Sequence, residues 1–307
     1  MTEPTAPAPV DPQTATVGVL GLGIMGLAYA RNLIKAGWRV SGYDLSSTQT
    51  DALAAAGGTV APSPSALGAA ADVVLIALPS IPALKSAVSD ADGLADGIRA
   101  GAIVAEMGTF PIDSKEAAQA ALSAKGATLL DCPVSGTGSQ AAAGDLSIYA
   151  SGDEAAVDAI RPVFAGLSRE TRYAGAFGNG MRLKYVANHL VTIHNLATAE
   201  ALLLAERSGL DLQMTFDAIV SGAGTSRIFE VRGPMMIEGR YEPATMKNDV
   251  YQKDIDLIMQ HAAALRSPVP LMATCLPYYS AALAEGRDKE DTAALFAVLQ
   301  QMTAPKT

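Results

Sequence analysis

The chain has 307 residues, enough for about two domains; half of them are hydrophobic and only 17% are charged, so folded cores are expected rather than long disordered regions. The net charge of −9 argues against nucleic-acid binding, and no apolar run reaches the length of a membrane span. The only two cysteines, Cys132 and Cys275, are too few for a disulfide framework, and with the three histidines they show no zinc-ligand spacing. A cytoplasmic protein with reduced thiols and no metal is expected.

The first fourteen residues are rich in Pro, Thr and Ala and lack the basic start and apolar stretch of a signal peptide. They are expected to form a disordered tail, residues 1–14. The chain then alternates between short apolar strands and Ala-rich helical segments. This alternation predicts an α/β fold, with an N-terminal Rossmann-type domain of residues 15–177 built on a parallel sheet that helices cover on both faces. The expected strands lie at 17–20, 39–43, 73–78, 102–105, 128–130 and 146–150.

The pattern changes near residue 177, after which no strand is expected. The remaining segments predict an all-α C-terminal domain, residues 178–307, joined to the first domain by a long helix. That long helix is apolar on most sides, which predicts that it is buried within the domain or in the interface of a homodimer or homotetramer. The expected helices lie at 181–207, 211–220, 248–265, 270–285 and 290–302.

A glycine-rich turn, Gly21-Leu22-Gly23-Ile24-Met25-Gly26, follows the first strand and opens the first helix. In G-x-G-x-x-G the first glycine allows a tight turn, the second lets the backbone approach a pyrophosphate, and the third lets helix and strand pack closely. Asp44 ends the second strand, eighteen positions after Gly26. This combination predicts dinucleotide binding. The alternative is a tight turn without a ligand.

Asp44 also bears on the choice of cofactor. A carboxylate at this position accepts hydrogen bonds from the ribose hydroxyls of NAD and repels the extra phosphate of NADP. No arginine follows it within residues 45–48 to hold that phosphate. NAD is therefore expected over NADP.

Lys184 and Asn188 lie four residues apart near the start of the long helix, and so share one face of it. A free lysine has a pKa of about 10.4. Burial and a nearby positively charged nicotinamide ring both lower this pKa toward the range of a useful base. Thr192 and Asn195 continue this polar stripe, which suits a helix that faces a cleft. The alternatives are an ordinary surface lysine, and threonine and asparagine side chains that only bond the backbone.

Four motifs in order resemble those of the β-hydroxyacid dehydrogenase family. The first is the glycine turn continuing to Asn32-Leu-Ile-Lys-Ala-Gly37, and the second is Asp131-Cys-Pro-Val-Ser-Gly136. The third is Gly178-Asn-Gly-Met-Arg-Leu-Lys184-Tyr-Val-Ala-Asn188, and the fourth is Lys253-Asp254. The resemblance covers nearly the whole chain after the tail.

The resemblance implies hydride transfer between a nicotinamide cofactor and a small anionic hydroxy acid or its semialdehyde. Lys184 would be the general base in oxidation and the general acid in reduction, and Asn188 would orient Lys184 or bind the substrate. Ser135, Gly136 and Thr137 would hold the substrate carboxylate through backbone amides. Thr137 stands where the family usually has a second glycine, and the alternative for these residues is a plain strand-to-helix loop.

The resemblance also implies cofactor contacts for Leu78 and Pro79, for Thr109, and for Lys253. The alternative for Lys253 is an ion pair with Asp249. Arg227 could bind a second anionic group, and a surface or interface arginine is its alternative. The competing functions are imine reduction on the same fold and a non-catalytic NAD-binding interaction protein. Lys184 argues against both, because relatives of those kinds lack this lysine.

Overall fold

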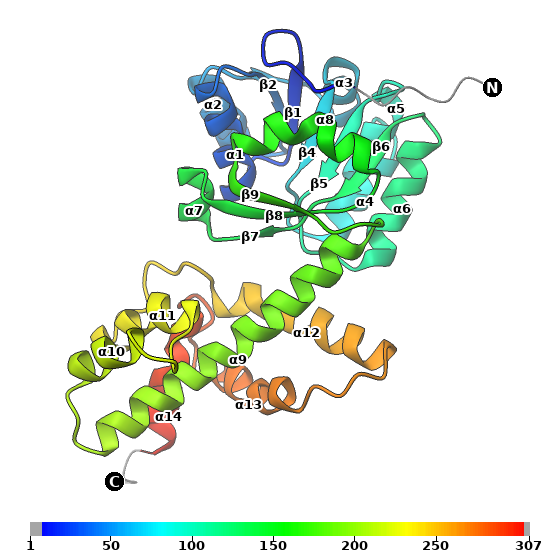
Figure 1. Ribbon diagram of the computed structural model, residues 1–307. Coiled ribbons are helices and arrows are strands. Elements are labelled where there is room, and N and C mark those ends of the chain that lie inside the picture. Colours follow the sequence, from blue (N-terminus) through cyan, green and yellow to red (C-terminus); the bar gives the residue numbers. More distant parts are fainter. Residues whose placement is uncertain (1–7, 304–307) are drawn as a thin grey trace. The chain divides into compact units, whose positions relative to one another are not determined.

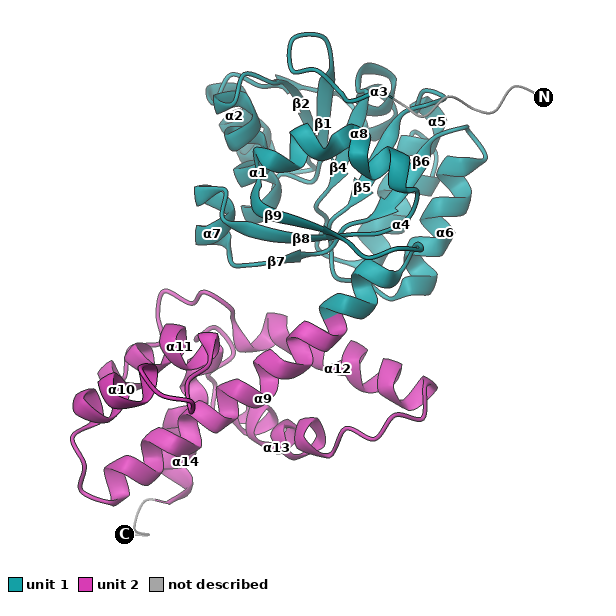
Figure 2. Cartoon of the chain, viewed as in Figure 1, with its two compact units in different colours: residues 1–184 teal, residues 185–307 magenta. Residues whose placement is uncertain are grey.

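The computed structural model describes residues 8–303 and divides into two compact units, residues 1–184 and 185–307 (Figure 1, Figure 2). Helix α9, Asn179–Arg207, crosses the boundary. Half of the expected disordered tail, residues 1–7, lies outside the described part. Residues 8–14 differ from that expectation, because the Val10 amide donates to Ala159 O at 2.9 Å and the Val10 side chain packs on the hydrophobic core.

The first unit is built on a parallel six-stranded sheet with the order β3-β2-β1-β4-β5-β6, counted over the described residues. This confirms the Rossmann-type sheet predicted from the sequence. The two-residue strand β3 was not expected, because both of its residues are exposed at the sheet edge. The strands are β1 Thr16–Leu20, β2 Arg39–Tyr43, β3 Thr59–Val60, β4 Val73–Ile76, β5 Ile103–Glu106 and β6 Thr128–Asp131.

Helices cover both faces of this sheet, and alternate strand residues point into two separate cores. In β4, Val73 and Leu75 belong to one core, and Val74 and Ile76 belong to the other. Burial on both faces explains why these strands read as continuous apolar runs. The helices of this unit are α1 Ile24–Lys35, α2 Ser47–Ala55, α3 Pro64–Ala70, α4 Ile81–Ser89, α5 Leu94–Gly97, α6 Ile112–Ser123, α7 Gly138–Ala143 and α8 Glu154–Ala165.

A second, three-stranded sheet follows β6, with the order β7-β8-β9. Its strands are β7 Val134–Ser135, β8 Leu146–Ala150 and β9 Ser168–Tyr173. The strand predicted at 146–150 therefore lies outside the main sheet. The short connection through α7 reverses the chain, so β8 pairs antiparallel with β7, whereas the crossover through α8 makes β9 parallel to β8.

The carboxyl ends of the main strands lie in one row across the sheet. Tyr43 pairs with Leu20, Leu20 with Ile76, Ile76 with Glu106, and Glu106 with Asp131. The loops that carry the predicted cofactor residues of this unit leave the sheet from this row, and the chain that leaves β6 here runs on into β7 and the predicted substrate loop. In open α/β sheets, ligands bind outside this edge.

The second unit is helical throughout its described residues, as predicted, apart from one isolated bridge between Lys247 and Asp291. Helix α11 was not expected from the sequence. No helix within residues 8–303 has the length and apolar character needed to cross a membrane. After α9, the helices are α10 Leu212–Val220, α11 Arg227–Glu238, α12 Asn248–Ala264, α13 Pro270–Ala284, a 3₁₀ turn at Thr292–Ala294 and α14 Leu295–Met302.

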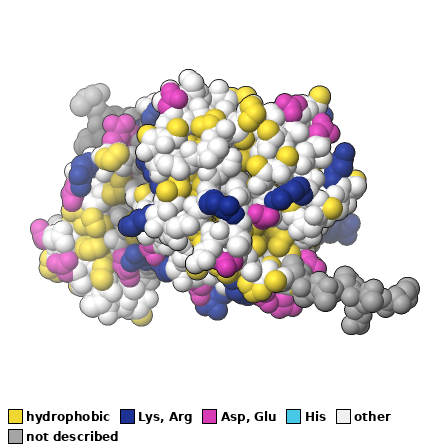
Figure 3. All heavy atoms as spheres, turned by 90° about the horizontal axis from the view of Figure 1, so that it is seen from above, with side chains coloured by type: hydrophobic (Ala, Val, Ile, Leu, Met, Phe, Trp, Pro, Cys, Tyr) yellow, Lys and Arg dark blue, Asp and Glu magenta, His cyan; other side chains and the backbone are white. Residues whose placement is uncertain are grey.

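The surface carries charges of both signs. On the face shown in Figure 3, Lys and Arg side chains are interspersed with Asp and Glu, and no broad field of positive charge is present there.

Candidate active site

The glycine-rich turn of residues 21–26, called the glycine finger below, contains three glycines, and each meets a different steric demand. Gly21 has φ +91°, and a Cβ there would lie 2.5 Å from Ala77 O. A Cβ on Gly26 would overlap Gly21 O, so this glycine lets α1 pack against the turn. A Cβ on Gly23 would meet no atom within 4 Å, which leaves the backbone open to a ligand. The turn therefore matches a pyrophosphate-binding loop.

Helix α1 begins directly after Gly23, which has no side chain to cap the first helical amides. These amides and the positive end of the helix dipole are suited to a cofactor diphosphate. Asp44 accepts from the Leu22 amide at 2.6 Å through Oδ2 and from the Ser46 amide at 2.9 Å through Oδ1. Its carboxylate therefore fixes the finger against the end of β2. Leu45, which follows it, is 93% exposed.

The other predicted cofactor residues of this unit lie at the same sheet edge. Leu78 and Pro79 follow β4, just before Ser80 caps α4 by accepting from the Ala83 amide at 3.3 Å. Thr109 follows β5 by three residues and is partly buried. The fold thus brings these three residues to the edge that carries the glycine finger.

The predicted carboxylate loop has a defined structure. Ser135 ends the short strand β7, and Gly136 has φ +142°. Thr137 caps α7: its amide donates to Gln140 Oε1 at 3.0 Å, and its hydroxyl accepts from the Gln140 amide at 3.5 Å. The threonine that replaces the usual glycine therefore forms a capping box, and one of the loop amides is used within the protein.

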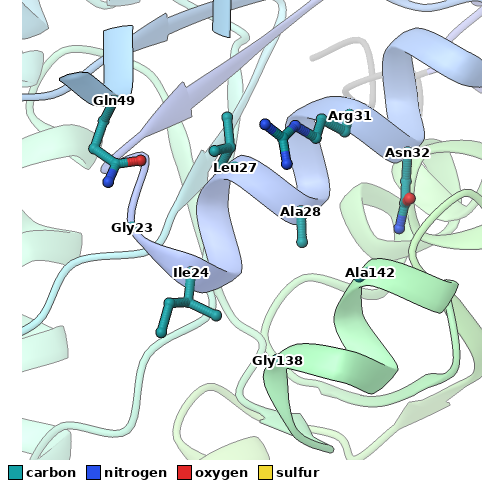
Figure 4. A pocket seen from close by; sticks show the side chains of 9 residues that line it. All are labelled: Gly23, Ile24, Leu27, Ala28, Arg31, Asn32, Gln49, Gly138 and Ala142. Carbon is teal, nitrogen blue, oxygen red and sulfur yellow. The ribbon is translucent and has the colours of Figure 1, made fainter. Parts of the chain in front are cut away.

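A cavity of ≈ 350 Å³ borders both the finger and helix α7, which begins directly after this loop (Figure 4). A Cβ on Gly138, at the start of α7, would lie 2.6 Å from Ile24 Cγ2, so the two segments touch. The glycine finger therefore touches the helix that follows the predicted substrate loop. The cavity is lined by Gly23, Ile24, Leu27, Ala28, Arg31, Asn32, Gln49, Gly138 and Ala142.

Lys184 and Asn188 lie on α9, and both are nearly buried, at 7% and 6% exposure. The first turn of α9 is bonded to the end of β6, because the Met181 amide donates to Asp131 Oδ2 at 2.8 Å. Lys184 therefore lies one turn from the strand that leads into the predicted substrate loop. Asn188 Nδ2 donates to Asp254 Oδ2 at 2.8 Å within the second unit.

The rest of the polar stripe does not extend the site. The Thr192 hydroxyl bonds the Tyr251 hydroxyl at 2.9 Å, and Asn195 Nδ2 donates to Tyr279 Oη at 3.1 Å and to Thr292 O at 2.8 Å. These two residues are fully buried and connect helices of the second unit. The expectation that the whole stripe faces a cleft is corrected accordingly.

Two further predicted residues lie in the second unit. Lys253 Nζ lies 3.8 Å from Asp254 Oδ1, while Asp249 pairs with Lys289 at 2.5 Å. Arg227 is the first residue of α11, and its 77% exposed side chain pairs with Glu230 at 2.9 Å. These contacts fit the alternative interpretation of Arg227 as a surface arginine.

Sequence reasoning missed a buried charge cluster at the same sheet edge. Lys115 of α6 lies between the carboxylates of Glu106 and Asp131, and all three side chains are fully buried. In the sequence, Lys115 looks like a solvated residue on an Ala-rich helix. The available signal was that two neighbouring strands, β5 and β6, end in an acidic residue. Both cysteines are buried thiols, and no cluster of metal-binding side chains occurs among the described residues.

Comparison with known proteins identifies two matching family models. The model for the NAD binding domain of 6-phosphogluconate dehydrogenase matches residues 16–175. A second model, described as "NAD-binding of NADP-dependent 3-hydroxyisobutyrate dehydrogenase", matches residues 178–299.

Individual relatives match over nearly their full length. L-threonate dehydrogenase from Cupriavidus necator is 32% identical over 290 residues, which cover 94% of this chain and 97% of the relative. The 2-hydroxy-3-oxopropionate reductase of Escherichia coli K12 is 32% identical over 292 residues, covering 94% and 99%. Among solved structures, 3-hydroxyisobutyrate dehydrogenase from Salmonella typhimurium has a TM-score of 0.81 at 31% identity, covering 92% and 99%. Psf3 in complex with NADP+ and 2-OPP has a TM-score of 0.82 at 28% identity, with the same coverage.

Proposed function

This chain belongs to the β-hydroxyacid dehydrogenase family, and on that premise we propose that it interconverts a short β-hydroxy acid and its semialdehyde or keto acid. The similarity to these relatives supports an oxidoreductase that acts on hydroxy acids with a nicotinamide cofactor. The proposal assigns proton transfer to Lys184 and NAD as the cofactor.

The observation that supports the proposal is the position of Lys184. Its side chain is 7% exposed, on a helix whose first turn is bonded to the end of β6. Lys184 thus lies on a helix that is anchored to the end of the strand leading into the Ser135–Thr137 loop. A buried amine close to a substrate hydroxyl is suited to proton transfer at neutral pH.

Each group has a separate role in the proposed reaction. When bound, the nicotinamide would accept a hydride during oxidation and donate one during reduction. Lys184 Nζ takes the proton from the substrate hydroxyl during oxidation and returns it to the carbonyl oxygen during reduction. The backbone at Ser135 and Gly136 binds the substrate carboxylate, and Asn188 sets the geometry of the reacting oxygen. Proton transfer by a positioned group of this kind contributes roughly 10²–10⁴-fold to the rate.

The cofactor that we propose is NAD. The Asp44 carboxylate lies at the end of β2, where the adenosine ribose of a Rossmann-bound cofactor is placed. Two backbone amides hold this carboxylate in place, so an additional ribose phosphate beside it would meet repulsion. The neighbouring Leu45 offers no cation in compensation.

A panel of short acids tests the proposal, with turnover followed by NADH absorbance. It should contain 3-hydroxyisobutyrate, glycerate, threonate, 4-hydroxybutyrate and a sulfonated analogue. With the best substrate, Lys184→Ala should lower kcat by about a hundredfold or more while NADH still binds. Lys125→Ala, which removes an exposed lysine of the same unit, is the matched control. Near-normal turnover by Lys184→Ala would exclude the proposed mechanism.

A further inference from the structure

Lys115 is a fully buried lysine with three acceptors around its ammonium group. Nζ donates to Gly108 O at 2.8 Å and to Asp131 Oδ1 at 2.6 Å, and it forms an ion pair with Glu106 Oε2 at 2.6 Å. Two of the three ammonium protons are thus used in hydrogen bonds, whereas the contact with Glu106 Oε2 is an ion pair without hydrogen-bond geometry. Glu106 Oε1 in turn accepts from the Gly108 amide at 2.8 Å, which closes the loop after β5 onto the same group.

The charge of Lys115 is maintained against its burial. Burial alone lowers the pKa of Lys115, but the Glu106 and Asp131 carboxylates outweigh this effect and raise the pKa. Burial raises the pKa of Glu106, and the Lys115 ammonium offsets this only in part. The cluster therefore keeps a cation opposite Asp131 at neutral pH.

The second oxygen of Asp131 extends this cluster to α9. Asp131 Oδ2 accepts from the Met181 amide at 2.8 Å and from the Ser151 hydroxyl at 3.1 Å, and Ser151 Oγ accepts from the Gly180 amide at 2.9 Å. These are amides of the first helical turn, which have no partner within the helix. A Cβ on Gly180 would lie 2.7 Å from Asp131 O, so the turn packs directly on the end of β6.

The cluster therefore joins three segments that the proposed reaction uses. Gly108 immediately precedes Thr109, the residue expected at the nicotinamide end of the cofactor. Asp131 opens the segment that ends in the Ser135–Thr137 loop. Met181 lies three residues, less than one helical turn, before Lys184. These connections all lie within the first unit and rest on side chains that solvent does not reach.

Stability alone does not account for such a cluster. Replacing a buried ion pair or triad by apolar residues of similar volume is often neutral or stabilising, because the Coulombic gain is offset by desolvation. An apolar side chain at position 115 would fill the same space. It would not, however, direct bonds to the end of β5, the end of β6 and the start of α9 at once. Directional bonds of this kind fix geometry, and reaction rates depend steeply on geometry.

We propose that Lys115, acting through Asp131 and Ser151, is a positioning residue that fixes the first turn of α9 and with it the reactive amine of Lys184. This role rests on the proposed function, because it requires Lys184 to take part in the reaction. Lys115 itself touches neither substrate nor cofactor in this arrangement.

Two substitutions test the role at different points of the network. Ser151→Ala removes the acceptor of the Gly180 amide and leaves the charges intact, and Lys115→Met removes the ammonium at similar length. Each should lower kcat by about tenfold or more, because a displacement of about 1 Å can cost about a hundredfold. The KM for the hydroxy acid should stay within about threefold. Rates are normalised to folded enzyme by titration with NADH.

The controls remove comparable interactions elsewhere. Ser168→Ala deletes a hydroxyl that donates to Phe164 O at 2.9 Å, and Arg232→Met breaks a buried ion pair of the second unit, 3.2 Å from Asp291. Both should lower the melting temperature while keeping kcat. Each test substitution is also combined with Lys184→Ala. These double variants should differ from Lys184→Ala alone by less than about twofold in rate, since the effects of residues that act through one group are non-additive.

The outcomes separate this role from the proposed function. If Lys184→Ala turns over normally, the proposed function fails. If Lys184→Ala is impaired while Ser151→Ala and Lys115→Met keep wild-type kcat, only the positioning role fails. The positioning role also fails if each substitution lowers the rate by the same factor in the wild-type and in the Lys184→Ala background. If Lys115→Met does not fold, the remaining test is Ser151→Ala, and a wild-type kcat for this variant would overturn the role, because Lys115 is proposed to act through Ser151.

Discussion

The side-chain amide of Asn188 has a defined orientation. Its Nδ2 donates to Asp254 Oδ2 at 2.8 Å, and an ionised carboxylate can only accept. The carbonyl oxygen of the amide is therefore turned away from Asp254. An acceptor on the same helix face as Lys184 is suited to hold either its ammonium or the substrate hydroxyl.

Asp254→Asn should loosen this orientation, because an asparagine can donate as well as accept and so permits both orientations of Asn188. We expect kcat to fall by about tenfold with only a small change in melting temperature, as for a lost charge-assisted hydrogen bond. Asp256→Asn is the matched control, since Asp256 is an exposed residue of the same helix whose carboxylate accepts from Gln252 at 3.0 Å. Equal activity of the two variants would contradict this role for Asp254.

Asp44 governs cofactor choice in the proposed function. Replacing it with serine and changing Leu45→Arg would remove the repelling carboxylate and supply a guanidinium, which pairs with a phosphate through two hydrogen bonds. We expect the ratio of kcat/KM for NADP to that for NAD to rise by about tenfold or more, equivalent to about 1.4 kcal/mol. Activity with NAD should also drop, since the Leu22 amide loses its acceptor. A wild-type enzyme that clearly prefers NADP would contradict the assignment.

At the scale of elements, one buried carboxylate holds several parts of the second unit together. Asp291 pairs with Arg232 of α11 at 3.2 Å, accepts from the Thr245 and Met246 amides at 2.8 and 3.0 Å, and accepts from the Ala293 amide at 3.0 Å. Burial acts to raise the pKa of Asp291, but Arg232 and the hydrogen bonds outweigh it, and the pKa is lowered. The charged form is therefore the one that the fold stabilises.

A lowered pKa in the folded state gives stability that is present above the unfolded pKa, about 3.9 for aspartate, and that is lost as the pH falls through the lower folded value. Asp291→Asn should cost about 3 kcal/mol of unfolding free energy at pH 7, as for a broken buried pair. Its melting temperature should fall less than that of the wild type between pH 5 and pH 3. Asp217→Asn, at an exposed site that accepts from Gln213, should behave like the wild type. Parallel pH curves for Asp291→Asn and the wild type would count against this account.

Elements were predictable where one physical signal dominated. The strand β2 was predicted with the bounds that are observed, and α9 was predicted within two residues, because their apolar patterns are long or uninterrupted. The strand β9, Ser168–Tyr173, is a polar sequence on a half-exposed sheet, so it has no apolar run to reveal it. Helix α11 contains Gly233 and Pro234, both poor helix formers, and its formation depends on tertiary contacts.

The candidate site also contains residues that were predictable from local sequence and residues that were not. The glycine finger was predictable because each of its glycines is required by steric constraints within a short segment. The partners of Thr192 and Asn195 were not predictable, since Tyr251 and Tyr279 lie more than fifty residues away in the chain. Lys115 was missed for the same reason: a lysine on an Ala-rich helix becomes a buried ion-pair partner only once β5 and β6 are adjacent.

At the scale of the whole molecule, α9 presents apolar side chains that remain exposed in a single chain. Leu183, Val186 and Leu190 are 38%, 59% and 48% exposed, and their spacing of three and four residues places them along one face of the helix. Asn188 and Thr192, by contrast, are buried within the second unit. An exposed apolar stripe beside a buried polar one is typical of a helix that is covered by another subunit.

We expect the protein to be a homo-oligomer, a dimer or tetramer, whose interface covers this stripe. Light scattering coupled to size exclusion should give a multiple of the 31.5 kDa chain mass. The double substitution Val186→Glu with Leu190→Glu should shift the protein to smaller species, because burying two carboxylates in an apolar contact costs several kcal/mol. Leu265→Glu, at a 65% exposed residue directly after α12, is the control and should leave the assembly intact. A wild-type protein that is monomeric at micromolar concentration would contradict this expectation, since the apolar stripe would then be exposed to water in the native state.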